Sequence, residues 1–165
     1  LDRIVPDCMK SWSKNHIVNI RNPNSTRPWQ HVLEPLSGYL LLGEKLKRSN
    51  ELNGEAYNFG PSSNQNFSVK DLINEMGKHW EKVKWDISAG DNPSSNEAGL
   101  LKLNCDKALF DLSWVPTLEF EETVEMTVHW YKEYYNNSPM DEYSLNQIIQ
   151  YMQLAKKRRN SWAID

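Results

Sequence analysis

The side chains best suited to chemistry lie in one short stretch, Arg27-Pro28-Trp29-Gln30-His31-Val32-Leu33-Glu34-Pro35. This stretch follows an expected strand and turn and leads into an expected helix. An arginine at such a junction can offer a planar fork of N–H donors to a diphosphate. A solvated loop arginine is the alternative for Arg27, and packing is the alternative role for Trp29 and His31. The residues alone leave both interpretations open.

The sequence contains no motif for a nucleotide-phosphate loop, a Tyr/Lys acid–base pair or a metal site. The seven glycines are scattered and form neither a G-x-G-x-x-G turn nor a Walker A loop, which would hold nucleotide phosphates. No tyrosine is followed four positions later by a lysine, so an acid–base pair on one helix face is missing. The four histidines show no metal-ligand spacing, so no metal is expected. Cys8 and Cys105 are far apart, which suits a reducing cytoplasm.

Hydrophobic spacing and turn residues predict short strands mixed with helices. Ser68 is expected to cap one helix, with Asp71 completing an imperfect capping box. No βαβαβ series is present, so the expected class is α/β, as an α+β-like lobe without a complete Rossmann core. The expected helices lie at 4–12, from 34 onward, at 68–80, 104–112, 119–135 and 141–159, and the expected strands at 17–20, 56–59, 83–87 and 100–103.

Apolar residues at helical spacing predict four of these helices. The helices at 68–80 and 119–135 are two of them. In the helix from 34 the apolar residues are Leu36, Tyr39 and Leu40, and in the last helix they are Leu145, Ile148, Ile149 and Met152.

Length and charge exclude several function classes. A chain of 165 residues fits one domain, and its net charge of −3 gives no global attraction to nucleic acid or an anionic membrane. The basic run 156–159 near the end of the last helix complements the helix dipole, with a nucleic-acid patch as the alternative. No apolar run approaches the roughly 18–20 residues of a membrane span, and no signal-peptide pattern is present. Because the chain starts at Leu1, we expect a fragment of a longer protein.

The run from Arg27 to Leu42 resembles the extended short-chain dehydrogenase/reductase superfamily, and within it the CDP-glucose 4,6-dehydratases. The wider superfamily carries an Arg-Asp-(aromatic)-x-x-Val-x-Asp pattern here, whereas the Pro-Trp-Gln-His-Val-Leu-Glu-Pro version resembles the CDP-glucose enzymes. The resemblance runs from residue 1 to about 136. Its supporting pieces are Ile4-Val5-Pro6-Asp7, Ala56-Tyr57-Asn58-Phe59-Gly60, Glu97-Ala98 and Trp114-Val115-Pro116.

The resemblance implies a two-part enzyme of which this chain is the smaller part. Such enzymes have an N-terminal Rossmann half that holds NAD and a catalytic Tyr-x-x-x-Lys, and a C-terminal part that closes over the sugar nucleotide. They oxidise C4 of the glucose, eliminate water across C5–C6 and return the hydride to C6. The whole enzyme is expected to be a cytoplasmic homo-oligomeric lyase of cell-surface sugar biosynthesis, such as that of lipopolysaccharide O-antigen.

The resemblance also carries roles to individual residues. Arg27 matches the arginine that contacts the diphosphate, and Pro6 and Asp7 match the segment beside the nucleotide. Glu97 matches a Glu-Ala pair that usually follows a histidine, although Asn96 stands there in this chain. The implied substrate-binding residues are Arg27, Pro6, Asp7, Trp29, Gln30, His31 and Glu97.

Many relatives place a second phosphate-binding arginine in the region of Asp91-Asn92-Pro93. Asn92 cannot replace that charge, so a second clamp must come from elsewhere.

The resulting hypothesis is a CDP-sugar-binding lobe at 1–140 followed by a helical tail at 141–165, inactive without its Rossmann half. In the whole enzyme it would serve the conversion of CDP-glucose to CDP-4-keto-6-deoxyglucose and water. Another sugar-nucleotide epimerase or dehydratase of the superfamily is the nearest alternative. A non-catalytic binding or assembly module is the alternative from a different class.

Overall fold

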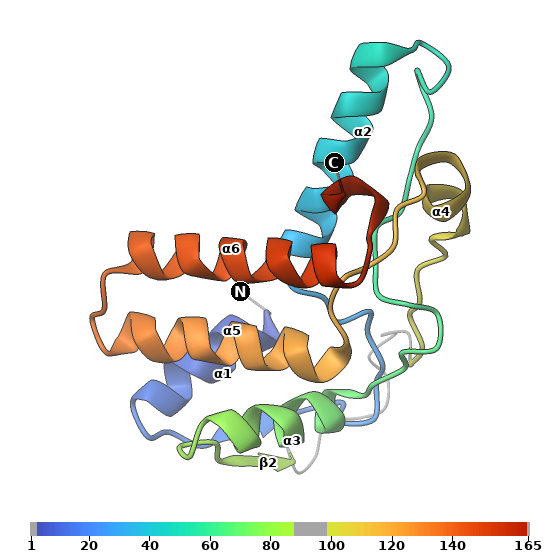
Figure 1. Cartoon of the computed structure of the whole chain (residues 1–165). Helices are drawn as coiled ribbons and strands as arrows, with labels where there is room; N and C mark the ends of the chain where they lie inside the picture. The colour runs from blue at the N-terminus through green and yellow to red at the C-terminus, as the bar shows by residue number, and fades with distance from the viewer. Residues whose placement is uncertain (1–2, 88–98, 165) are drawn as a thin grey trace.

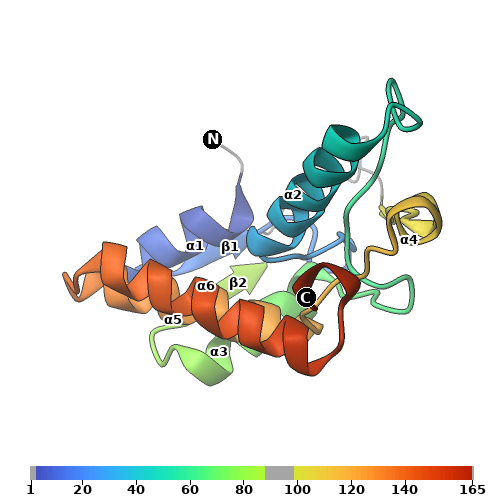
Figure 2. The ribbon, with the colours of Figure 1, turned by 45° about the horizontal axis from the view of Figure 1, so that its top comes forward.

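The computed structural model describes residues 3–87 and 99–164, and most of this chain is helical (Figure 1). Helices α1, α3 and α5 and the two strands lie at one end of the molecule, and α2 and α4 lie at the other (Figures 1 and 2). The elements in chain order are α1 (Ile4–Ser13), β1 (Val18–Ile20), α2 (Leu33–Arg48), α3 (Val69–His79), β2 (Trp85–Ile87), α4 (Asp106–Leu112), α5 (Phe120–Tyr135), α6 (Met140–Lys157) and a 3-10 turn at Ser161–Ala163.

The larger hydrophobic core joins α1, α3, α5 and β1. Trp12 of α1 is fully buried, and its indole Nε1 donates a 2.8 Å hydrogen bond to the carbonyl of Lys84 beside β2. The strands are parallel, with Val18 opposite Trp85, and the connection between them contains α2 and α3. The buried members of this core are Cys8, Met9, Trp12, Ile20, Val69, Leu72, Ile73, Met76, Trp80, Phe120, Val124 and Val128.

A smaller core joins α2 to α4 and the segments beside them. The ring of Phe59 lies edge-on to Trp114, with centroids 5.0 Å apart, and it also covers Gly38 of α2. A Cβ at Gly38 would lie 2.3 Å from the Phe59 ring, so only glycine allows this close approach. The buried members are Leu41, Phe59, Ala108, Leu112 and Trp114.

The start of α3 has the capping box that the sequence predicts. The Ser68 hydroxyl accepts from the backbone N–H of Asp71 at 3.1 Å, and the Asp71 carboxylate accepts from the N–H of Ser68 at 2.8 Å. The next two N–H groups, of Val69 and Lys70, donate to backbone carbonyls at positions 25 and 23. These bonds fix the loop that precedes Arg27 against α3.

The expected helices are confirmed, as are the strands that become β1 and β2, but the strands expected at 56–59 and 100–103 are wrong. The segment at 56–59 does come near the end of the segment at 100–103, because the side-chain amide of Asn58 donates to the Asn104 carbonyl at 3.2 Å. Gly60 also meets the side chains of Leu103 and Cys105. Side-chain packing thus takes the place of a backbone ladder. The class is still a mixed helical lobe with two parallel strands in the described ranges, and not a Rossmann core.

Helix α2 was predicted from its apolar residues, and the structure exposes the face that carries them. Leu40 is 77% exposed and Leu36 and Tyr39 are also exposed, whereas the buried face carries Glu34 and Ser37. None of the helices in the described ranges is both long and apolar enough to cross a membrane.

Helix α6 repeats this inversion, with Leu145, Ile148, Ile149 and Met152 exposed. Three of these residues line a hollow of about 750 Å³ together with Leu36 and Leu40 of α2. We call the exposed apolar side chains of this hollow (Leu36, Leu40, Ile148, Ile149 and Met152) the α2–α6 surface.

Candidate functional site

Two hollows meet at the start of α1 and share four lining residues. The first, of about 910 Å³, lies between α1, β1 and the segment that leads to Arg27. The second, of about 700 Å³, lies between the Trp29–Leu33 segment and helices α3, α5 and α6. The shared residues are Arg3, Val5, Pro6 and Trp29.

The structure places six of the seven expected site residues around these hollows. Arg27 and Asp7 line the first, Gln30 and His31 line the second, and Pro6 and Trp29 line both. The seventh, Glu97, lies outside the described residues, as do Asn96 and Asn92.

Arg27 follows a backbone position that hydrogen bonds hold in place. The preceding residue, Thr26, bridges Ser68 in antiparallel fashion, and its N–H donates to the carbonyl of Gly99 at 2.9 Å. The Nη1 group of Arg27 itself donates to the Thr26 carbonyl at 2.8 Å. The guanidinium is therefore held at the rim of the first hollow.

Two further arginines line the first hollow, and sequence reasoning missed both. Arg3, Arg21 and Arg27 stand there, and among the lining residues that the structure describes Asp7 is the one carboxylate. Arg21 directly follows β1, and ligands of parallel α/β folds bind beyond the carboxyl ends of strands. That position is the signal that could have found it. Such a concentration of guanidinium groups favours a phosphorylated ligand.

Asp7 and Pro6 lie in the first turn of α1. The Asp7 carboxylate accepts from the backbone N–H of Arg3 at 3.3 Å and so fixes the start of the helix. Burial, with the nearby Asp7 charge, raises the pKa of the Cys8 thiol to about 12. This thiol is therefore protonated near neutral pH and is no nucleophile.

Trp29 lines both hollows, and Gln30 lines the second. The indole Nε1 of Trp29 donates to the carbonyl of Phe67 at 2.9 Å, which fixes its ring. The side-chain oxygen of Gln30 is buried and finds no hydrogen-bond partner among the described residues. Buried polar atoms usually have partners, so this oxygen is an exception among the described residues that line the second hollow.

His31 is buried, with 7% of its surface exposed, and it contacts the backbone. Its Nδ1 accepts a 3.3 Å hydrogen bond from the N–H of Leu33 at the start of α2. Burial lowers the pKa of His31 to about 4, so its ring is neutral near pH 7. A neutral ring that already accepts from the backbone is suited to shape the turn and not to donate protons from a charged form.

Glu34 is the second feature that sequence reasoning missed, although the motif contains it. Its carboxylate is 2% exposed and accepts from the N–H groups of Thr117 at 3.0 Å and Leu118 at 2.6 Å. The hydroxyl of Tyr151 donates to it at 2.9 Å. Burial raises the pKa of Glu34, while these hydrogen bonds oppose the shift. A glutamate among apolar motif residues was the available signal for such a buried anchor.

The glycines that the structure describes do not form a cradle for a dinucleotide. Gly38 and Gly60 allow close packing of side chains, since a Cβ at Gly60 would lie 2.8 Å from Leu103. Gly43, Gly54 and Gly99 meet no atom within 4 Å of such a Cβ. The described residues therefore fit a phosphorylated ligand at the arginines and do not fit the NAD-binding turn of a Rossmann fold.

Comparison with known proteins gives this geometry a family. No family model matches the chain. Its sequence is 38% identical over 152 residues to CDP-glucose 4,6-dehydratase of Salmonella typhimurium strain LT2, which is 92% of this chain and 42% of that enzyme. Over nearly all of its length the chain is therefore similar to part of a CDP-glucose 4,6-dehydratase, as a C-terminal fragment of an extended short-chain dehydrogenase/reductase would be. It spans about two fifths of the length of the relatives it matches.

Solved structures show the same fold. The UDP-glucuronic acid 4-epimerase of Bacillus cereus, in complex with UDP-glucuronic acid and NAD, matches 81% of this chain and 40% of that chain with a TM-score of 0.66 at 17% identity. The UDP-glucose-4-epimerase of Stenotrophomonas maltophila, with bound NAD and formylated UDP-arabinopyranose, matches 84% of this chain and 42% of that chain with a TM-score of 0.66 at 15% identity. The C-terminal regions of these epimerases share the architecture of this chain.

Proposed function

We propose that this chain is the sugar-nucleotide-binding region of a CDP-glucose 4,6-dehydratase, with a lobe at 1–140 and a helical tail at 141–165. The observation that carries the proposal is the 38% sequence identity to such an enzyme over 92% of the chain. Three arginines line one hollow, and guanidinium groups of this kind can bind the phosphates of a sugar nucleotide, which supports the proposal.

The first hollow would hold the diphosphate of CDP-glucose. Arg27 is the primary contact, since its backbone is fixed and guanidinium forks match phosphate oxygens. Arg21 or Arg3 supplies the second clamp that Asn92 cannot provide, because both line the same hollow. Pro6 and Asp7 would lie beside the nucleotide.

The second hollow would hold another part of the same ligand. Trp29 separates it from the diphosphate, and Gln30 and His31 line it. His31 fixes the turn between them. Glu97 is retained as a substrate-binding candidate on the ground of the family resemblance.

The α2–α6 surface would contact a partner that carries the rest of the enzyme. Apolar side chains gathered in a surface hollow favour contact with another protein surface. We assign this partner as the N-terminal Rossmann half, which would bind NAD and supply hydride transfer and the catalytic Tyr-x-x-x-Lys. The whole enzyme would work in the cytoplasm as a homo-oligomer in cell-surface sugar biosynthesis.

A sugar-nucleotide 4-epimerase is the second candidate function, because the solved structures of the same architecture include epimerases. One experiment separates the two. The complete enzyme that contains this chain is incubated with NAD and either CDP-glucose or UDP-glucose, and the products are resolved by chromatography and mass spectrometry. We expect loss of water from CDP-glucose. A product with the mass of the substrate, or turnover of UDP-glucose alone, would contradict the proposal.

A further inference from the structure

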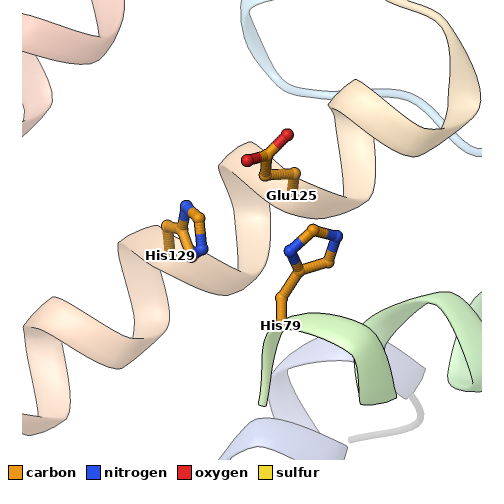
Figure 3. Close-up of side chains that lie close together, drawn as sticks. All are labelled: His79, Glu125 and His129. Carbon is orange, nitrogen blue, oxygen red and sulfur yellow. The ribbon is translucent and has the colours of Figure 1, made fainter.

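Three side chains of types that can bind a metal ion lie close together, and none of them lines either of the two hollows. His79 ends α3, and Glu125 and His129 lie one helical turn apart on α5 (Figure 3). One ligand atom from each lies within 4.8 Å of the others. The rings of His79 and His129 meet edge-on, with centroids 5.4 Å apart. No motif in the sequence joins these residues, since His79 comes from a different helix.

The donor set suits a transition-metal ion. Imidazole nitrogens with one carboxylate oxygen are common ligands of Zn²⁺, and such sets of three leave a further position for water or another ligand. Ligand atoms around a tetrahedral zinc lie roughly 3.3 Å apart, so small side-chain rotations would bring the three together. Glu125 is exposed and free to rotate, and the two histidines are half-buried, which limits the motion required of them.

The charged side chains near the three residues are partly balanced and do not prevent a cation from binding there. Glu75, one turn before His79 on α3, lies 3.8 Å from His79 Nε2 and bonds closely to Lys78. Its carboxylate therefore partly balances a cation at His79. On α5, Lys132 lies 3.6 Å from Glu81, so its charge is also partly balanced.

The site is separate from the proposed substrate hollows. Val124 and Val128 line the second hollow, and each is followed directly by a member of the cluster. One residue step turns an α-helix by about 100°, so the cluster lies on a different face of α5. A metal here would act on the helices and not on a bound nucleotide.

We propose that His79, Glu125 and His129 bind one divalent transition-metal ion of the zinc type, which links the end of α3 to α5. The ion would hold together α3 and α5, which both contribute side chains to the larger core. The three protein ligands leave a coordination position open to solvent.

The test is titration of the untagged protein, stripped of metal, with Zn²⁺ in competition with a chromogenic chelator. We expect one saturable site, with affinity reduced at least about tenfold in Glu125→Gln and further in His129→Ala. His16→Ala is the matched control, because His16 is an exposed histidine in the loop between α1 and β1. Titration with Co²⁺ gives a second readout, since tetrahedral coordination produces a visible absorption band.

Glu125→Gln keeps the test valid if the histidine variant fails to fold, because Glu125 is exposed. Zn²⁺ should also raise the melting temperature of the wild type more than that of Glu125→Gln. Absence of a saturable site in the wild type, or equal Zn²⁺ affinity in wild type and Glu125→Gln, would overturn the proposal.

Discussion

The hydroxyl of Tyr151 donates a 2.9 Å hydrogen bond to the buried carboxylate of Glu34, across 117 positions of the chain. Tyr151 also reaches the hydroxyl of Ser37, to which the indole of Trp114 donates as well. The helix that begins at Met140 thus contacts the same segment that carries Arg27 and His31. A movement of α6 would therefore also displace the start of α2, where the second hollow begins.

Removal of this bond should lower stability in a graded way. We expect Tyr151→Phe to cost about 1–2 kcal/mol in the free energy of unfolding, because one hydrogen bond to a carboxylate is lost. Glu34→Ala should cost about 3 kcal/mol or more, because the N–H groups of Thr117 and Leu118 are left buried without an acceptor. Chemical denaturation measures both.

A double-mutant cycle checks that the two residues act together. The combined variant should lose less than the sum of the two single losses, since they remove the same bond. Glu121→Gln, on the exposed side of α5, is the control and should change stability little. Strict additivity would contradict the contact.

His31 should make stability depend on pH. Burial lowers the pKa of folded His31 to about 4, against about 6.5 for a free histidine, so the unfolded chain binds the proton more readily between these values. Stability should therefore be complete above about pH 6.5 and should fall by up to roughly 3 kcal/mol as the pH drops to about 4. Denaturation curves at several pH values measure the slope.

The comparison variant is His31→Gln, which keeps a hydrogen-bond acceptor but does not titrate. Its curve should be flatter than that of the wild type between pH 6.5 and 4. His16→Gln should keep the wild-type slope, since His16 is exposed. Parallel curves for wild type and His31→Gln would rule out His31 as the source.

The α2–α6 surface should make the isolated chain prone to association. Leu40 is 77% exposed and Ile149 is 42% exposed, and both line the same hollow. We expect the isolated chain to bind a hydrophobic dye and to self-associate, and Leu40→Gln with Ile149→Gln to reduce both effects. Phe110→Gln is the control, because Phe110 is 88% exposed but lies on α4, away from this surface. A monodisperse, dye-negative wild type would contradict the expectation.

The helices could be predicted from the sequence because local signals determine them. The capping box at Ser68 and Asp71 and the apolar spacing of α3 agree with its tertiary packing. The spacing of α2 and α6 identified helices equally well, but it could not tell which face is buried. On α2 the buried face carries Glu34, Ser37 and Gly38 beside Leu41, and distant partners satisfy the polar groups of Glu34 and Ser37.

The strands and the sites depend more on contacts between distant segments. The segments at 56–59 and 100–103 have strand-like composition, yet side chains such as Phe59 and Asn58 are used for packing and for a bond to Asn104. Arg27 was chosen as a candidate because a family motif surrounds it, and it lines the first hollow. Arg3 and Arg21 lack such a motif, and only the fold brings them to the same hollow.

Arg27 gives the most direct test of the substrate site. In the complete enzyme, Arg27→Ala should weaken CDP-glucose binding by about 10- to 150-fold, because hydrogen bonds to a charged phosphate contribute about 1.5–3 kcal/mol. Arg27→Lys should recover part of the loss, since an ammonium keeps the charge but not the bidentate geometry. Calorimetric titration with CDP and with CDP-glucose should show the same ratio for both ligands if the contact is with the diphosphate.

Arg48→Ala, on the exposed end of α2, controls for loss of positive charge at a distance from the hollow. A solvated loop arginine predicts a change of under about threefold for all three variants and an unchanged salt dependence. Equal affinities of wild type and Arg27→Ala would remove Arg27 from the site and leave Arg3 and Arg21 as the candidates for the phosphate contact.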